Sequence, residues 1–249
     1  MPVEVERVLL YAFAGGHGDL ATRLRQLGYE AILEDEPRAA AARVAHHAEP
    51  VRAVLLPAGF VLPHRGGELD HLLRAAGSAG LRFVACGERP AADAQHRLRE
   101  KQVRLCLWSP FHDRELRFVV NRALFDPTGS FYDPEKAEVR HDLRVPTELA
   151  ARVKVAEREK PALVYSLSVG GCFLEMQRPT LVGGGIEILL PLPLGEFRVS
   201  SRVILTNVPG NLQRSNLPRG MGVEFQRLVP DAREAIQHFV RQRARAYEL

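Results

Sequence analysis

The hydrophobic periodicity of the sequence changes once, close to its midpoint, and this change limits the folds that the chain can adopt. Before it, short apolar runs alternate with segments of helical period; after it, apolar and polar residues alternate along short runs separated by Gly, Pro and Asn clusters. Strands separated by helices favour a parallel sheet, whereas short alternating strands favour an antiparallel one. The sequence therefore predicts two domains of different class, for which 249 residues are sufficient.

The first domain is expected to be a doubly wound α/β fold around a parallel sheet. Its strands follow the apolar runs, and its helices follow the segments of helical period between them. The expected strands are residues 7–13, 31–33, 51–56, 81–86 and 103–108, and the expected helices are residues 19–27, 37–47, 68–76, 91–100 and 112–124.

A segment rich in turn-forming residues separates the two periodicities. It begins at Asp126 and reads DPTGSFYDPE, and its two prolines are incompatible with a continuous helix. We therefore expect residues 1–125 to form the first domain, residues 126–136 a linker, and residues 137–249 the second domain.

The second domain is expected to be a small antiparallel β-barrel closed by a helix. Several short strands at close spacing with turn residues between them are typical of such barrels. The expected strands are residues 149–155, 162–166, 172–176, 185–190, 197–206 and 221–225, and the expected helix is residues 230–247.

The layout of residues 7–125 resembles the receiver domain of response regulators, which has the flavodoxin-like strand order. That family needs an acidic pair after the first strand to bind a divalent cation, and an aspartate at the end of the third strand to accept phosphate. Here the first apolar run continues into YAFA from Tyr11, and the third ends in LLP at Pro57, with no carboxylate at either place. The resemblance therefore implies a pseudo-receiver that is not phosphorylated and that contacts a protein partner, with a homodimer through residues 112–124 as one possibility.

Catalytic and metal-binding motifs are missing from the sequence. It has no G-x-S-x-G serine and no Cys/His cluster with the spacing of a zinc site. Gly15-Gly16-His17-Gly18 lies between an expected strand and helix, but it lacks the G-x-G-x-x-G spacing and the lysine of a P-loop, so an ordinary turn is favoured. We expect no enzyme activity, no metal and no cofactor.

Two motifs in the second half resemble those of the PilZ domain family. The segment from Arg140 to Arg144 reads RHDLR and fits R-x-x-x-R, and the segment from Ser166 to Gly171 reads SLSVGG and is close to D/N-x-S-x-x-G. The resemblance extends over residues 137–249 and includes a late strand and a closing helix. It implies a receptor for the bacterial second messenger cyclic di-GMP, with Arg140, Arg144, Ser166, Ser168 and Gly171 as ligand-binding residues.

Arginine suits this ligand, because cyclic di-GMP presents two phosphodiester anions and two guanine rings. A guanidinium pairs with phosphate oxygens in bidentate fashion and also stacks on a base. Ser168 would add a hydroxyl, and Gly171 would allow a tight turn of the backbone near the ligand. The family has Asp or Asn where this chain has Ser166, and a serine cannot reproduce a bidentate contact to guanine, which costs about 1–3 kcal/mol of binding free energy.

A simpler interpretation of these residues stays open. Arg140 and Arg144 could form exposed ion pairs with nearby acids, which contribute little, and Ser166 to Gly171 could form a plain hairpin turn. Four other arginines that could supplement the site are better explained as exposed residues of the barrel surface: Arg152, Arg178, Arg202 and Arg219.

The basic excess of the chain lies entirely in its second half. Residues 1–136 contain 18 basic and 18 acidic side chains, and residues 137–249 contain 16 and 12. This excess is too weak for general nucleic-acid binding but favours a small anion. No apolar run is long enough to span a bilayer, the first residues do not resemble a signal peptide, and three cysteines in apolar runs suit reduced thiols in the cytoplasm.

Two functions follow from these observations. In the first, the chain is a cyclic di-GMP receptor that transmits ligand binding to a partner protein by reorienting its two domains. In the second, the barrel has lost its ligand through Ser166, and the chain is an adaptor or scaffold that acts through protein contacts alone.

Overall fold

The computed structural model describes residues 5–13, 18–46, 50–60, 66–76, 81–125, 143–211 and 216–249. The chain divides into two compact units. The N-terminal unit comprises residues 2–140 together with Ala246–Leu249, and the barrel unit comprises His141–Arg245. Each unit is described by itself.

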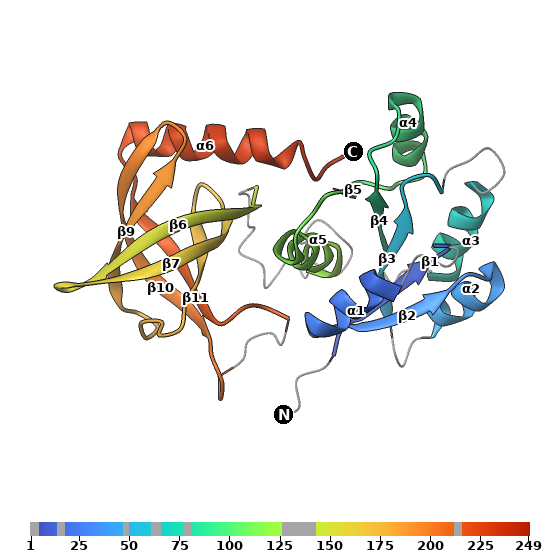
Figure 1. Cartoon of the computed structure of the whole chain (residues 1–249), viewed down its shortest axis with the longest axis horizontal. Coiled ribbons are helices and arrows are strands. Elements are labelled where there is room, and N and C mark those ends of the chain that lie inside the picture. The colour runs from blue at the N-terminus through green and yellow to red at the C-terminus, as the bar shows by residue number, and fades with distance from the viewer. Residues whose placement is uncertain are drawn as a thin grey trace. The chain divides into compact units, whose positions relative to one another are not determined.

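The N-terminal unit is a five-stranded sheet in the order β2-β1-β3-β4-β5, with helices on both faces (Figure 1). All of its strand pairs are parallel, which confirms the expected flavodoxin-like arrangement. Its strands are β1 (Arg7–Tyr11), β2 (Glu30–Glu34), β3 (Val51–Pro57), β4 (Arg82–Gly87) and β5 (Leu105–Trp108), and its helices are α1 (Gly18–Gln26), α2 (Pro37–Ala45), α3 (Gly66–Ala76), α4 (Ala92–Glu100) and α5 (Asp113–Phe125).

Burial on both faces explains why the strands of this sheet are continuous apolar runs. Val8, Leu9 and Leu10 of β1 are fully buried although alternate side chains point to opposite faces. One face packs against α2, α3 and α4. Helices α1 and α5 contact each other, and α5 also contacts β3, β4 and β5.

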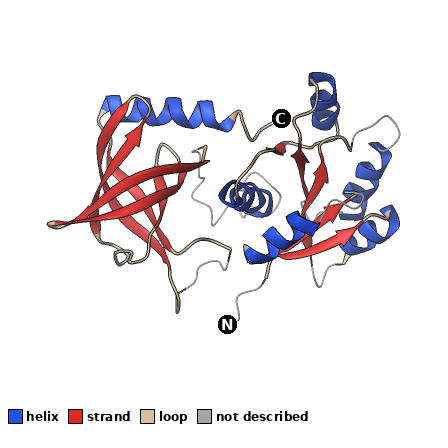
Figure 2. Cartoon of the chain, viewed as in Figure 1, coloured by secondary structure: helices blue, strands red, loops and turns tan. Residues whose placement is uncertain are grey.

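The barrel unit is a closed antiparallel barrel in the order β10-β11-β8-β7-β6-β9, followed by one helix (Figure 2). The expected barrel and closing helix are thereby confirmed; five strands extend beyond the residues expected for them, and β8 begins and ends one residue earlier than expected. The strands are β6 (Val145–Val155), β7 (Arg158–Leu167), β8 (Gly171–Glu175), β9 (Gly185–Leu192), β10 (Gly195–Asn207) and β11 (Gly220–Arg227), and the helix is α6 (Pro230–Ala244).

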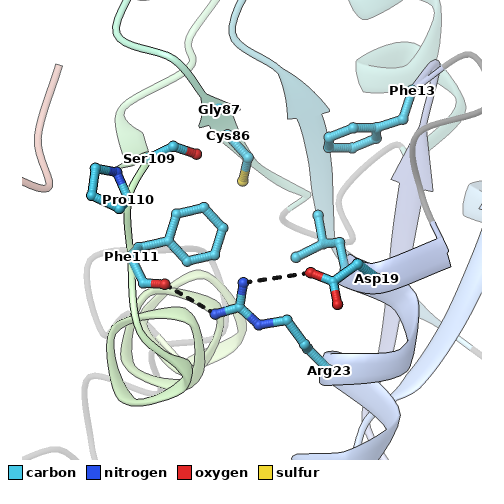
Figure 3. A pocket seen from close by; sticks show the side chains of 9 residues that line it. Phe13, Asp19, Arg23, Cys86, Gly87, Ser109, Pro110 and Phe111 are labelled. Atoms are coloured by element: carbon cyan, nitrogen blue, oxygen red, sulfur yellow. Dashed lines mark hydrogen bonds and ion pairs between the residues drawn. The ribbon is translucent and has the colours of Figure 1, made fainter.

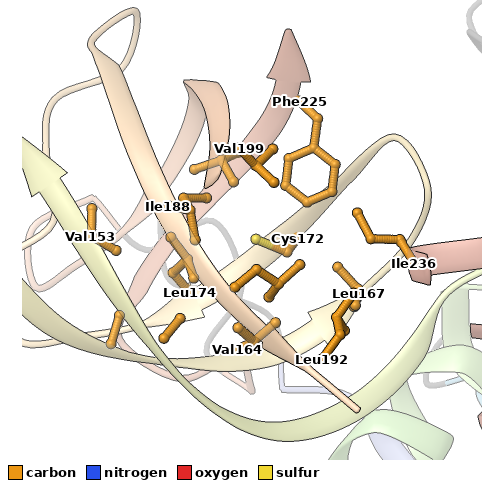
Figure 4. Packing of buried hydrophobic residues seen from close by; sticks show 14 of the residues in the cluster. Val153, Val164, Leu167, Cys172, Leu174, Ile188, Leu192, Val199, Phe225 and Ile236 are labelled. Atoms are coloured by element: carbon orange, nitrogen blue, oxygen red, sulfur yellow. The ribbon is translucent and has the colours of Figure 1, made fainter. Parts of the chain in front are cut away.

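Inward-facing apolar side chains of all six strands fill the barrel (Figure 4). Val164, Leu174 and Ile188 are fully buried there. Helix α6 adds Ile236 and Val240 to the same cluster, so its apolar face stabilises the barrel. Among the described residues, no helix is long and apolar enough to cross a membrane.

The last helix is shorter than expected, and the residues after it belong to the other unit. The sequence predicts a helix to Tyr247, but α6 ends at Ala244, and Ala246–Leu249 joins the N-terminal unit. Tyr247 is buried there, and its carbonyl accepts a hydrogen bond from the Cys106 amide. The local sequence has no residue that predicts the end of the helix at Ala244. Tertiary contacts of the following residues end the helix there, against their local helix propensity.

All three cysteines are buried and free. Burial raises the pKa of Cys86 well above its usual range and raises the pKa of Cys106 and Cys172 to about 12. Because the thiolate is the reactive form, these thiols are protected both by their position and by their protonation.

Strand β8 passes so close to β11 that Gly171 has no room for a side chain. A Cβ atom at Gly171 would lie 2.2 Å from the carbonyl oxygen of Val223. The glycine is therefore required by the approach of two backbones, which the sequence does not reveal. Gly185, at the start of β9 in the same barrel, has no atom within 4 Å of its Cβ position.

We expect Gly171→Ala to lower the free energy of unfolding of the barrel unit by about 1–3 kcal/mol, because the added methyl group forces β8 away from β11. Urea denaturation of the full chain measures this change. Gly185→Ala is the matched control and should change the free energy by less than about 0.5 kcal/mol. Equal effects of the two substitutions would contradict the close approach.

We expect the native protein at pH 8 to react very slowly with iodoacetamide. A thiol with a pKa of about 12 has only about one thiolate in ten thousand molecules at pH 8, and burial further limits access. Mass spectrometry should find no alkylation under conditions in which the urea-unfolded chain is labelled at all three cysteines. Rapid labelling of the native protein would show that the thiols are accessible.

Candidate functional site

Pairing of β6 with β7 brings the two motifs of the second half together. Pro146 is the register partner of Ser166, and Val145 is the partner of Leu167. Arg144 directly precedes β6, so it lies beside the end of β7 where the second motif begins. Residues 22 positions apart in the sequence thus meet at one end of a strand pair.

Arg144 and Ser166 are in direct contact. The Nη1 atom of Arg144 donates a hydrogen bond to the hydroxyl oxygen of Ser166 over 3.1 Å. Ser166 is buried, whereas Arg144 is partly exposed. A buried neutral hydroxyl therefore helps to orient this guanidinium. Arg140, the first residue of the motif, lies outside the described residues.

Ser168 and Gly171 form the turn between β7 and β8. The carbonyl oxygen of Gly171 accepts hydrogen bonds from the Ser168 amide over 2.8 Å and from the Ser168 hydroxyl over 3.1 Å. The hydroxyl proton of Ser168 is thus donated within the turn, and the hydroxyl oxygen of Ser168 keeps lone pairs that can accept a hydrogen bond. In this arrangement Ser168 suits an N–H donor such as a guanine edge better than a phosphate oxygen.

The charge of Arg144 also reaches the start of β8. Burial raises the pKa of Cys172, and the nearby positive charge of Arg144 acts in the opposite direction without reversing the shift. The positive charge of Arg144 therefore acts at the start of β8 as well as on Ser166. The site combines a cation, a hydroxyl donor at Ser166 and a hydroxyl acceptor at Ser168.

Arg243 is a further cation at this end of the barrel, and sequence reasoning missed it. Its Nε atom donates to the carbonyl oxygen of Pro146 over 3.3 Å, and Pro146 is the register partner of Ser166. From the sequence, Arg243 is interpreted only as a basic residue that interacts favourably with the dipole at the end of a helix. No local signal could show that the last turn of α6 reaches the start of β6.

The other arginines considered from the sequence are exposed. Arg152 lies within 3.6 Å of Glu159 and 3.3 Å of Glu196, and Arg219 donates to the side chain of Gln177. Arg178 and Arg202 are exposed as well. These positions agree with an ordinary charged barrel surface.

The N-terminal unit contains a separate pocket at the carboxyl ends of its strands (Figure 3). This edge is where parallel α/β sheets usually bind ligands. The pocket has a volume of about 340 Å³, and it is lined by Phe13, Asp19, Leu20, Arg23, Cys86, Gly87, Ser109, Pro110 and Phe111. Gly15, Gly16 and His17 lie outside the described residues.

Side chains of this pocket neutralise one another. Arg23 lies 3.9 Å from Asp19 and 2.6 Å from Asp113, and it donates to the carbonyl oxygen of Phe111 over 3.1 Å. Its guanidinium also stands over the Phe111 ring at 4.8 Å. Of the nine lining residues, only Asp19 is acidic, so the pocket lacks the acidic pair that holds a cation in receiver domains.

Comparisons with known proteins identify the second half of the chain. The family model described as the PilZ domain matches residues 138–242. No curated protein matches the chain.

Solved structures with similar parts include both kinds of domain. The inhibitor of motility MotI/DgrA of Bacillus subtilis matches at 18% identity and a TM-score of 0.37, over 43% of this chain and 52% of that one. The PilZ domain of Escherichia coli YcgR with c-di-GMP matches at 18% identity and a TM-score of 0.35, over 43% and 93%. A signal receiver domain of an HD domain-containing protein from Pseudomonas fluorescens Pf-5 matches at 18% identity and a TM-score of 0.40, over 49% and 95%.

The chain thus spans only about half the length of the Bacillus subtilis protein. The strand order describes the fold of the N-terminal unit, and the family match describes residues 138–242. Residues 138–242 are thus similar to the PilZ domain family, and a unit with the flavodoxin-like strand order precedes them.

Proposed function

We propose that the chain is a cyclic di-GMP receptor that passes ligand binding on to a partner protein. The observation that carries this proposal is the 3.1 Å hydrogen bond from Arg144 to Ser166, which joins the two motifs of the PilZ domain at one end of a strand pair. The family match over residues 138–242 supports the choice of ligand.

Each residue of the site has a distinct part in this proposal. Arg144 binds a phosphodiester oxygen and stacks on a guanine, and Arg140 adds a second guanidinium when its segment closes. Ser166 donates its hydroxyl proton to a guanine acceptor, and Ser168 accepts from a guanine N–H. Gly171 keeps the β7–β8 turn against β11, which holds both serines in place.

The output follows from where Arg140 and Arg144 lie in the sequence. The segment between α5 and β6 connects the two units, and both arginines are in it or next to it. Closure of this segment on a ligand changes its backbone conformation and with it the orientation of the units, which alters contact with a protein partner. The N-terminal unit acts as a pseudo-receiver without phosphorylation, and it can also form a homodimer through α5.

An adaptor without a ligand is the second candidate. It is favoured by Ser166, which replaces the Asp or Asn of the family motif and has its oxygen already engaged by Arg144. In either function the three buried thiols suit the reducing cytoplasm.

Calorimetric titration of the full chain with cyclic di-GMP tests the receptor directly. We expect saturable heat for the wild type and binding weakened about ten- to hundredfold by Arg144→Ala, because a charge-assisted hydrogen bond contributes about 1.5–3 kcal/mol. Arg202→Ala, which removes an exposed arginine of the same barrel, is the control and should leave the affinity unchanged. Absence of heat at high micromolar ligand, or equal affinity of Arg144→Ala and wild type, would reject the receptor.

Substitution of Ser166 separates the two candidates. We expect Ser166→Asp to bind cyclic di-GMP about ten- to hundredfold more tightly than the wild type, because a carboxylate can accept two hydrogen bonds from guanine. Ser200→Asp places the same charge on an exposed position of β10 and should have no effect. If the wild type is silent and Ser166→Asp binds, the adaptor is the correct function.

A further inference from the structure

Strand β5 stands at the edge of the parallel sheet, and the last four residues of the sequence cover that edge. The strand order ends at β5, and an uncovered edge strand presents unpaired N–H and C=O groups. The Cys106 amide donates to the Tyr247 carbonyl over 3.1 Å, and the Leu249 amide donates to the Arg104 carbonyl over 3.0 Å. Leu105 and Glu248 form an antiparallel bridge between these two bonds.

Side chains of this segment contact the same unit. Tyr247 is 4% exposed, and the centroid of its ring lies 6.4 Å from that of the Phe118 ring of α5. Its hydroxyl donates to a carboxylate oxygen of Glu115, also on α5. A buried aromatic ring with a partner for its hydroxyl is a strong local anchor.

The two residues that follow Tyr247 add further contacts. Glu248 lies 2.6 Å from Arg122 of α5. Leu249 packs against the core cluster that α2, α3 and α4 share with the sheet. The segment is thus held by its backbone, by one buried ring, by an ion pair and by an apolar contact.

We infer that the edge of β5, together with the adjoining face of α5, is a docking surface for an extended segment, and that residues 246–249 of this chain occupy it as a releasable clasp. The surface accepts a short strand in antiparallel orientation. It selects an aromatic residue with a hydroxyl beside Phe118, an acid opposite Arg122 and an aliphatic residue on the core.

Release of the clasp requires far less than unfolding of the unit. Two backbone hydrogen bonds, the anchored Tyr247 ring, one ion pair and one apolar contact hold it, whereas the sheet beneath it contains fully buried strands. Segments with so few contacts open at low free energy, separately from the core. While the clasp is closed, β5 is unavailable to a strand of another chain; when it opens, that edge is exposed.

The position of the clasp links it to the barrel. Arg243, three residues before the segment, is bonded to β6 of the barrel unit, and Ala246 already belongs to the N-terminal unit. The chain therefore passes between the units a second time at Arg245.

Site-resolved amide hydrogen exchange of the full chain tests the clasp. In the wild type we expect the Leu249 amide to be protected at least about tenfold against its intrinsic rate, and Cys106 to be protected as well, since the two amides lie on the same strand pair. An unprotected Leu249 amide in the wild type would overturn the inference without any variant.

Tyr247→Ala is expected to accelerate exchange at Cys106 and at Leu249 at least about tenfold, because the buried ring is lost. Ala58, whose amide donates to the Cys86 carbonyl over 2.8 Å within the sheet, reports on the unit as a whole and should not change. Arg245→Ala, at the exposed residue just before the segment, is the control and should leave all three rates as in the wild type. Unchanged exchange at Cys106 in Tyr247→Ala, or equal acceleration at Cys106 and Ala58, would show that these residues are a fixed part of the fold and not a clasp.

Discussion

The pairing of β6 with β7 is the interaction on which the candidate site depends. The register that places Pro146 opposite Ser166 also places Arg144 beside the β7–β8 turn. A shift of one residue would turn every side chain of β6 to the other face of the sheet, and the buried Val145 and Val153 of the barrel core oppose such a shift. The apolar interior of the barrel thus determines where a guanidinium at its end can lie.

Serine at position 166 gives this site a different electrostatic character from the family motif. A carboxylate there would form an ion pair with Arg144, whereas the hydroxyl accepts one hydrogen bond and carries no charge. The same substitution weakens recognition of a guanine edge. In the proposed receptor, position 166 would therefore influence both the attraction of phosphate and the selection of the base.

The two units share more than the segment between α5 and β6. Because α6 ends at Ala244 and Tyr247 is buried in the N-terminal unit, the chain is attached to that unit at both ends of the barrel domain. Close to the second connection, Arg243 is bonded to the Pro146 carbonyl at the start of β6. The barrel unit is thus joined to the N-terminal unit through two covalent connections.

Local sequence was sufficient for the class of both domains, their elements and the two motifs, because each rests on periodicity or on residues close together in the chain. Continuous apolar runs predicted the buried parallel strands, and alternating residues predicted the barrel. The sequence could not reveal the contact of Arg144 with Ser166, the need for glycine at Gly171, the approach of Arg243 to Pro146 or the return of Tyr247 to β5. Each of these joins residues that are distant in the chain, and only the packing of the folded backbone brings such residues together.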